Sequence, residues 1–412
     1  MEKKVIHAAL LGFGTVGTGV YKVLKNQEEE MEAKLGSVVR IKKIMVRNLE
    51  KAAAKVEDPS VLTNNWEEIV NDQDIDIIIE LMGGIEPART CILEALEAGK
   101  HVVSANKDLI AVYGKELLDT AETHQVDFLF EAAVAGGIPI IRPLNSSLTA
   151  DEIDEISGIL NGTTNYILTK MAEENADFED VLKEAQEKGY AERNPEADVE
   201  GYDACRKIAI LSSLAFGCHV DYEDIYTEGI TKITVEDVKY AKGLGMSIKL
   251  LATSKREDGR FYAMVSPVLV GQDSPLYSVN GVFNAIFIHG NVLGDAMFYG
   301  SGAGKLPTAS AVVGDVVDCA KHLHRNIMMS WSSKRLELMD IKDVEHPFFV
   351  RIKGSMTGDI GSVEEVFGQV KTVGVPDVAG EFGFVTAPMS EAEFEEKAAG
   401  LPDIISRIRI RA

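Results

Sequence analysis

Two charged side chains stand one helical turn apart at the start of an apolar stretch, and their types suit proton transfer. Asp203 and Lys207 occur in NPEADVEGYDACRKIAIL, residues 194–211. On a helix they share a stripe with Ile210 and Leu214, so the pair lies at the mouth of a buried face. A desolvated ammonium has a lowered pKa and exchanges protons near neutral pH. An ordinary helix-capping ion pair, contributing about 0.2–0.5 kcal/mol, is the alternative that this stretch leaves open.

A glycine-rich turn near the start of the chain predicts dinucleotide binding. The stretch LLGFGTVGTGV has the pattern GxGxxG directly after a predicted strand. The first glycine permits a tight turn, the second lets backbone amides approach a pyrophosphate, and the third allows close helix packing. The candidate cofactor residues are Gly12, Phe13, Gly14, Thr15, Val16 and Gly17. A plain tight turn is the alternative.

The cofactor preference depends on the end of the second predicted strand. NAD-preferring sites usually have an acidic residue there for the ribose hydroxyls, whereas this chain has Arg47. Arginine favours a 2′-phosphate, so we expect NADP, with NAD as a possible second cofactor. Later strand ends supply the stretches ELMGG and SANK, which contain Gly83, Ser104, Asn106 and Lys107. Because the carboxyl ends of the strands face the ligand crevice, we expect these residues near the nicotinamide and the substrate.

The stretch EAAVAGGIP suggests a cation site. Glu131 precedes closely spaced carbonyls in a turn that glycine permits, and such oxygens suit a hard cation. A turn with one structural carboxylate is equally compatible with the sequence.

The elements that must position these residues form an α/β pattern. Within residues 5–130, continuous apolar runs alternate with amphipathic stretches, which predicts a Rossmann-type, doubly wound parallel sheet. The predicted helices here run through Tyr21 to Leu35, near Leu49 to Val56, and through Ala88 to Glu97. The glycine-rich turn after residue 130 should lead into a helix that Pro139 opens.

Three domains are expected. Residues 1–135 form the dinucleotide-binding domain, which a returning helix near 307–325 completes. Residues 136–306 form an α+β catalytic and dimerisation domain. Residues 330–344 resemble a linker. Residues 345–412 read strand, helix, strand, strand, helix, strand, the order of a small ferredoxin-like unit, long enough to be independent.

Composition limits the partners. The 412 residues carry a formal charge of −23, which argues against nucleic-acid and anionic-membrane partners. No apolar stretch approaches the length of a membrane span. Four widely spaced cysteines indicate reduced thiols in a cytoplasmic protein. Small molecules and other protein chains are the expected partners.

Read in order, these motifs resemble those of the homoserine dehydrogenases. The resemblance covers roughly residues 5–325 and rests on GFGTVG, SANK, EAAVAGGIPII, GILNGTTNYIL, GYAERNPEADVEGYDACRKIAIL and YGSGAGKLPTASAVVGD. It implies reversible reduction of L-aspartate 4-semialdehyde to L-homoserine with NAD(P)H, on the path to threonine and methionine.

The resemblance also implies roles for single residues. Lys207 is the proton donor, Lys107 holds and polarises the substrate, and Asp203 orients the Lys207 ammonium or binds the substrate amine. Glu192 and Asp198 add negative charge for that amine. The remaining implied residues are Gly162, Thr163 and Tyr190 for the substrate, Gly189 and Gly302 for the cofactor, and Glu131 with the carbonyls of Val134, Gly136 and Ile138 for a sodium or potassium ion.

Departures from the family pattern limit what the resemblance implies. Asn194 and Pro195 replace the more usual Asp-Pro, so the charge of that aspartate is missing. The tail looks like an ACT domain, which can bind a regulatory amino acid such as threonine, but its usual Pro-Gly turn before the first helix is replaced by GDIGS, residues 358–362. A purely structural or dimerising tail is the alternative. The family implies a homodimer or higher oligomer.

Two rival functions stay open. Another amino-acid-linked dehydrogenase is the first, and its sharpest version oxidises a semialdehyde through a thioester, which needs a nucleophilic cysteine beside a base. Cys205 and Cys218 lie in a predicted apolar helix and are poor candidates. The second rival is a non-catalytic dinucleotide-sensing regulator.

Overall fold

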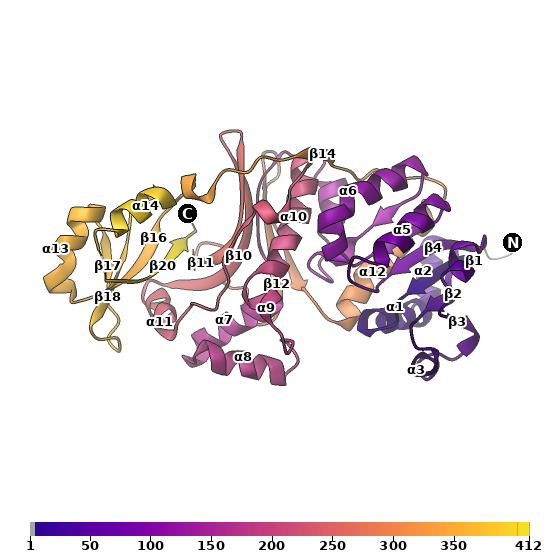
Figure 1. The fold of residues 1–412 in the computed structure, drawn as a ribbon, viewed down its shortest axis with the longest axis horizontal. Helices are drawn as coiled ribbons and strands as arrows, with labels where there is room; N and C mark the ends of the chain where they lie inside the picture. Colours follow the sequence, from indigo (N-terminus) through magenta and orange to yellow (C-terminus); the bar gives the residue numbers. More distant parts are fainter. Residues whose placement is uncertain (1–4, 402, 412) are drawn as a thin grey trace. The chain divides into compact units, whose positions relative to one another are not determined.

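The computed structural model describes residues 5–401 and 403–411, which form two compact units. The first unit contains the residues up to 150 together with 209–221 and 300–335. The second contains residues 151–208, 222–299 and those from 336 onward. Figure 1 shows the elements of both. Among the described residues, no helix is both long and apolar enough to cross a membrane.

The first unit is built on a six-stranded sheet in the order β3-β2-β1-β4-β5-β6, and all its strand pairs are parallel. Its strands are β1 (Val5–Leu11), β2 (Val38–Met45), β3 (Leu62–Thr63), β4 (Ile75–Glu80), β5 (His101–Ser104) and β6 (Phe128–Leu129). Three consecutive residues of β4, Ile77, Ile78 and Ile79, are fully buried, so both faces of the strand are covered. The prediction of a doubly wound parallel sheet is confirmed.

Helices cover both faces of this sheet (Figure 1). They are α1 (Thr15–Asn26), α2 (Glu28–Leu35), α3 (Leu49–Ala53), α4 (Glu67–Val70), α5 (Ala88–Glu97), α6 (Lys107–Thr123) and α12 (Lys305–Lys321). Helix α12 packs against α1, while α5 and α6 pack together. At the α1–α12 contact, a Cβ added to Gly19 would lie 2.8 Å from the carbonyl oxygen of Lys305, so glycine permits the close approach.

Three helix predictions in this unit need correction. The helix expected through Tyr21 to Leu35 is two helices that separate at Gln27, because the run Glu28–Glu30 favours a helix N-terminus over a helix interior. Helix α6 was not predicted. The helix expected to open at Pro139 begins two residues later: residues 141–147 are helical, with the turn η3 assigned to Pro143–Ser147, and amides 140–142 bond to Glu131.

The second unit is built on a mixed sheet in the order β13-β12-β7-β10-β11-β20-β16-β18-β17, with β9 paired to β11. Its strands are β7 (Ile153–Ile159), β9 (Tyr226–Thr227), β10 (Met246–Glu257), β11 (Arg260–Gly271), β12 (Phe283–Gly290), β13 (Gly294–Ser301), β16 (Phe348–Lys353), β17 (Lys371–Val373), β18 (Glu381–Val385) and β20 (Ile404–Ile410). Its helices are α7 (Gly162–Glu174), α8 (Phe178–Glu187), α9 (Glu196–Val199), α11 (Val235–Gly243), α13 (Met356–Phe367) and α14 (Glu391–Ala398). Helix α10 (Tyr202–Phe216) begins in this unit and ends in the first.

The tail has the six predicted elements in the predicted order, but it is not a separate sheet. Strand β20 pairs in parallel with β11 at Val268 and Leu269, so the sheet runs from the middle of the chain into the tail. One detail was wrong. Helix α13 begins at Met356 with a Ser355 cap, so residues 358–362 lie inside the helix instead of forming a turn before it.

The segment expected as a linker, residues 330–344, also contains regular structure. Its strand β14 (Ser332–Arg335) pairs with β8 (Cys218–His219), and a 3₁₀ turn, η5, spans Ile341–Asp343. The short strands β15 (Glu345–His346) and β19 (Met389–Ser390) pair next to it. Further short turns are η1 (Pro59–Val61), η2 (Glu131–Ala133) and η4 (Tyr222–Asp224).

Candidate active site

The Lys207 ammonium is shielded from solvent and fixed from two directions. Its Nζ donates to Asp203 Oδ2 over 2.6 Å and to the carbonyl oxygen of Leu160 over 2.8 Å. The side chains of Lys207 and Asp203 are only 12% and 10% exposed. Within the described residues, no third acceptor lies within hydrogen-bond distance of Nζ. The ammonium therefore retains one N–H for an external acceptor, and the low exposure of both side chains differs from that of an ion pair on the surface of a helix.

One buried amide joins Asp203 to a second carboxylate. Asn161 Nδ2 donates to Asp203 Oδ2 over 2.9 Å and to Asp198 Oδ1 over 2.7 Å. Burial raises the pKa of Asp198, the bond from Asn161 opposes that rise, and the neighbouring charge of Asp203 adds to it. Sequence reasoning identified both carboxylates but missed Asn161, although the position between strand β7 and helix α7 marks it as an N-cap.

The other substrate candidates lie on α7 and after α8. Thr163 Oγ1 donates to the carbonyl oxygen of Tyr190 over 2.7 Å, which ties the first turn of α7 to the end of α8. Gly162 is required at its position, because an added Cβ would lie 2.7 Å from the carbonyl oxygen of Val282. Glu192 is exposed, and among the described residues no hydrogen bond or ion pair joins its carboxylate to Asp198 or Asp203.

The cofactor candidates of the first unit lie at the carboxyl ends of its strands. Gly12 has a φ of +96°, and an added Cβ would lie 2.6 Å from the carbonyl oxygen of Leu81. A Cβ on Gly17 would lie 2.4 Å from the carbonyl oxygen of Gly12, whereas one on Gly14 would meet nothing within 4 Å. The first and third glycines thus close the turn, and the second faces open space. This arrangement fits a pyrophosphate at the start of α1.

A buried carboxylate holds two of these strand ends together. Glu80 accepts from the amides of Met82 and Gly83 and from Ser104 Oγ, the last over 2.7 Å. Asn106 donates to the carbonyl oxygen of Gly84 over 2.6 Å and caps α6, which begins at Lys107. Burial raises the pKa of Glu80, and its hydrogen bonds oppose the rise. The predicted residues Gly83, Ser104 and Asn106 therefore form one connected group.

The first unit contains two hollows, one of about 310 Å³ lined by Glu131, Arg142 and Asp315 and a second of about 610 Å³ beside α1. The second is lined by Gly14 and Thr15 and by three lysines, Lys22, Lys55 and Lys305, which sequence reasoning missed. Their positive charge suits phosphate groups. Arg47 follows β2, is exposed, and is not among the residues that line this hollow.

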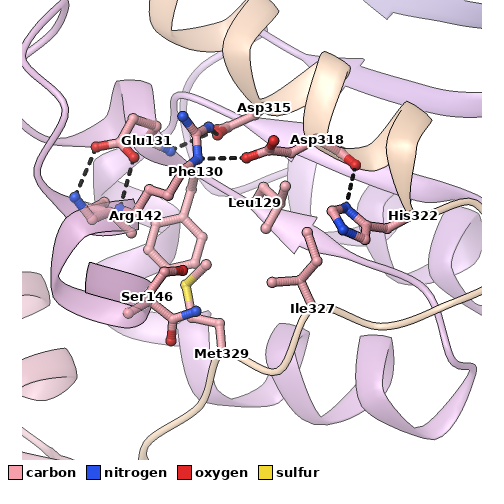
Figure 2. Close-up of a pocket in the computed structure, with 12 residues that line it drawn as sticks. Leu129, Phe130, Glu131, Arg142, Ser146, Asp315, Asp318, His322, Ile327 and Met329 are labelled. Atoms are coloured by element: carbon pink, nitrogen blue, oxygen red, sulfur yellow. Dashed lines mark hydrogen bonds and ion pairs between the residues drawn. The ribbon is translucent and has the colours of Figure 1, made fainter. Parts of the chain in front are cut away.

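The candidate cation turn is buried, and the Glu131 side chain within it lies beside Arg142 (Figure 2). Glu131 accepts from the amides of Ile140, Ile141 and Arg142 over 2.6–2.8 Å, so its side chain caps a helical turn. Three carbonyl oxygens are different: among the described residues, no donor reaches those of Val134, Gly136 and Ile138. Unpartnered, closely spaced carbonyls are suitable ligands for a monovalent cation.

This turn contacts the segment that contains Gly302. The amide of Gly137 donates to the carbonyl oxygen of Ser301 over 3.1 Å. Gly136 has a φ of +53°, and an added Cβ would lie 2.4 Å from the carbonyl oxygen of Gly302. The structure therefore brings together two sequence motifs that lie more than 160 residues apart. Gly189, by contrast, lies in the second unit after α8, with a φ of +75°.

Three of the four cysteines are poor candidates for a nucleophile, and Cys218 lies in strand β8 and not in the apolar helix that was predicted to contain it. All are free thiols, and Cys91, Cys205 and Cys319 are buried. Burial raises the pKa of Cys91 to about 11 and the pKa of Cys319 well above its ordinary value. Cys205 Sγ donates to the carbonyl oxygen of Tyr222. Because the thiolate is the nucleophile, these environments disfavour oxidation through a thioester.

Comparison with known proteins agrees with this geometry. Residues 139–317 match the family model "Homoserine dehydrogenase", and residues 12–131 match "Homoserine dehydrogenase, NAD binding domain". The homoserine dehydrogenase of Bacillus subtilis is 40% identical over 97% of this chain and 96% of its own. That of Synechocystis is 50% identical over 76% of this chain and 73% of its own. The chain belongs to the homoserine dehydrogenase family.

Solved structures support the same assignment. A homoserine dehydrogenase from Thiobacillus denitrificans has a TM-score of 0.90 at 38% identity and covers 99% of both chains. A hyperthermophilic archaeal homoserine dehydrogenase in complex with NADPH has a TM-score of 0.65 at 27% identity, covering 76% of this chain and 97% of its own. The chain is thus an NAD(P)-dependent oxidoreductase, and Lys207, Asp203, Asp198 and Asn161 form one connected polar group within it.

Proposed function

We propose that Lys207 transfers the proton in the interconversion of L-aspartate 4-semialdehyde and L-homoserine. The observation that supports this is the shielded ammonium with two fixed partners and one remaining N–H. When bound, the nicotinamide supplies or accepts the hydride. Hydride addition to the aldehyde builds alkoxide charge, and an ammonium within hydrogen-bond reach both stabilises that charge and protonates it. Lys107 would hold and polarise the substrate.

The substrate ammonium is assigned to the carboxylates beside Lys207. Asp198 and Asp203 are held by one amide, so their negative charges are close together. A zwitterionic amino acid needs such charge for its amine, and Lys207 balances only part of it. Gly162, Thr163 and Tyr190 are proposed to line the same pocket, and Glu192 to add charge from its exposed position.

NADP is the proposed preferred cofactor, with NAD as a possible second one. Arg47 after β2, together with the lysines of the hollow beside α1, provides the positive charge that a 2′-phosphate needs. The GFGTVG turn would take the pyrophosphate, and Gly83, Ser104, Asn106, Gly189 and Gly302 would approach other parts of the dinucleotide. A sodium or potassium ion is proposed at the carbonyls of Val134, Gly136 and Ile138 next to Glu131.

The remaining proposals concern assembly and regulation. We propose a homodimer or higher homo-oligomer formed through the middle of the chain, and a cytoplasmic location that suits four free thiols. The tail is proposed to be an ACT-like regulatory domain that binds an amino acid such as threonine, with a structural or dimerising role as the alternative. Its element order and strand order, 4-1-3-2 in chain order, support the ferredoxin-like unit.

The proposed cofactor preference has a direct test. NADPH formation from homoserine and NADP should be compared with NADH formation from homoserine and NAD, by absorbance. We expect a higher kcat/KM with NADP, and Arg47→Gln should lower it about tenfold or more for NADP only, because the 2′-phosphate loses a charged contact. Lys34→Gln, an exposed α2 lysine paired with Glu30, is the control and should have no effect. Equal losses with both cofactors would contradict the assigned role of Arg47.

A further inference from the structure

The side-chain amide of Asn161 has a fixed orientation. Its Oδ1 accepts from the amide of Thr164 over 2.9 Å, in the N-cap position of α7, and from Thr164 Oγ1 over 3.1 Å. Because a backbone N–H can only donate, the oxygen of the amide must face Thr164. Nδ2 must therefore face the opposite side, where it meets Asp198 and Asp203. The residue is 6% exposed, so water does not compete for these bonds.

Each hydrogen of Nδ2 is used by a different carboxylate. One donates to Asp198 Oδ1 and the other to Asp203 Oδ2, the same oxygen that accepts from Lys207. The preceding residue, Leu160, supplies the carbonyl that is the second acceptor of the Lys207 ammonium. Two consecutive residues after β7 thus fix three ionisable side chains that come from a different part of the chain.

These contacts stabilise the ionised form of Asp198. Burial and the charge of Asp203 raise the pKa of Asp198, and the amide is the first of the groups that lower it. A donor that bonds to the charged form of a carboxylate favours that form. Without the amide, the Asp198 carboxylate would lose a hydrogen bond that favours its ionised form, while the negative charge of Asp203 would remain nearby. Protonation of Asp198 would therefore begin at a higher pH.

We propose that Asn161 is a positioning residue that keeps Asp198 ionised and holds Asp198 and Asp203 as a paired receptor for the substrate ammonium. This inference rests on the proposed function, because it needs an aminated substrate at these carboxylates. Asn161 does not act on the reacting atoms. It acts through Asp198 and Asp203, and its α7 cap links them to the turn that contains Gly162 and Thr163.

The test distinguishes loss of the Asn161 Nδ2 donor from loss of the N-cap of α7. Asn161→Ser keeps a good N-cap side chain and removes the NH₂ donor, and Asn161→Asp keeps the cap and replaces the donor with an acceptor. Homoserine oxidation should be measured from pH 5.5 to 9 in the full-length protein. The acidic limb of kcat/KM for homoserine should move up by about one pH unit in Asn161→Ser and further in Asn161→Asp, because a hydrogen bond to a charged group is lost. The KM for homoserine should rise about tenfold or more, with the KM for NADP unchanged.

The controls identify a purely structural effect. Ser390→Ala removes the N-cap of α14 and should leave the pH profile unchanged. In an Asp198→Asn background, Asn161→Ser should cause no further pH shift, since the titrating group is absent. NADPH binding and circular dichroism report whether each variant is folded. If Asn161→Ser does not fold, the pH dependence of kcat/KM in Asn161→Asp, compared with that of the wild type, tests the inference.

A failure of the proposed function can be distinguished from a failure of the inference about Asn161. Wild-type protein that does not oxidise homoserine contradicts the proposed function. Active wild-type protein with folded Asn161 variants and an unmoved acidic limb overturns the inference about Asn161 alone.

Discussion

Burial at single residues decides which groups titrate in this protein. His346 is 8% exposed, and its ring packs edge-on against Tyr262 and Phe348. Its Nε2 has no hydrogen-bond partner among the residues that the structure describes. Burial, together with the positive charge of Arg409, lowers the pKa of His346 to about 4. The neutral imidazole is therefore part of the folded state, while the unfolded chain binds the proton near the ordinary pKa.

This difference predicts loss of stability in acid. Between pH 6.5 and 4 the unfolded state binds more protons at His346, so the free energy of unfolding falls as the pH falls, by up to about 3 kcal/mol from this group. His346→Gln should flatten that dependence, as measured by urea unfolding at pH 7, 6, 5 and 4.5. His289→Gln is the matched control, because that imidazole is exposed and pairs with Asp295. An equally steep acid loss in the His346 variant would refute the role of this group.

At the scale of elements, the glycines in the turn from β1 into α1 have different roles. The Cβ of an alanine at position 17 would overlap the carbonyl of Gly12, whereas at position 14 it would point into open space. The third glycine is thus needed for the fold, and we propose that the second leaves room for the pyrophosphate of the cofactor.

Two substitutions distinguish the structural role of Gly17 from the proposed binding role of Gly14. Gly17→Ala should lower both the Tm of the cofactor-free protein and the affinity for NADPH, because the turn must open. Gly14→Ala should leave the cofactor-free Tm nearly unchanged and weaken NADPH binding about tenfold or more, because the methyl group occupies the space of the pyrophosphate. Thermal unfolding and NADPH fluorescence titration measure the two effects. An equal loss of Tm in both variants would contradict the assignment.

These elements also show what sequence can predict. The turn GFGTVG is local, so its pattern predicted both the geometry and the ligand class. Asn161 contacts Asp198 and Asp203 from 37 and 42 residues away, and no periodicity reports such a contact. The break at Gln27 lacks glycine or proline, and only the following glutamates indicate it. Helix α6 was not predicted although Asn106 is an N-cap, because the stretch SANK was interpreted only as a strand end that faces the ligand crevice.

At the scale of the whole molecule, the tail and the middle of the chain share one sheet in the second unit. The pairing of β20 with β11 joins residues that lie about 140 positions apart. The order of the predicted elements and the length of the tail do not report such a pairing, so they suggested an independent module. Ion pairs reinforce the pairing. Arg351 bonds to Asp237 over 2.8 Å with both side chains under 5% exposed, and Arg411 bonds to Glu155 over 2.6 Å.

Removal of the tail should therefore damage the fold as well as any regulation. Deletion of residues 345–412 exposes the β11 edge and leaves Asp237 buried without its cation, and breaking a buried pair costs about 3–5 kcal/mol. We expect a lower Tm and aggregation on size-exclusion chromatography. Arg351→Gln should reproduce part of the loss of Tm, and Lys353→Gln, exposed on the same strand, should not. A monodisperse truncated protein with the wild-type Tm would contradict this view.

The role of Lys207 is the central claim, and one comparison of turnover tests it most directly. Lys207→Met should be compared with Lys170→Met, which removes an equally spaced but more exposed ion pair with Glu174. With aspartate 4-semialdehyde and NADPH, we expect kcat to fall at least about a hundredfold in Lys207→Met and to stay unchanged in Lys170→Met. NADPH affinity should be retained in both. A Lys207→Met protein that turns over at the wild-type rate would contradict the account.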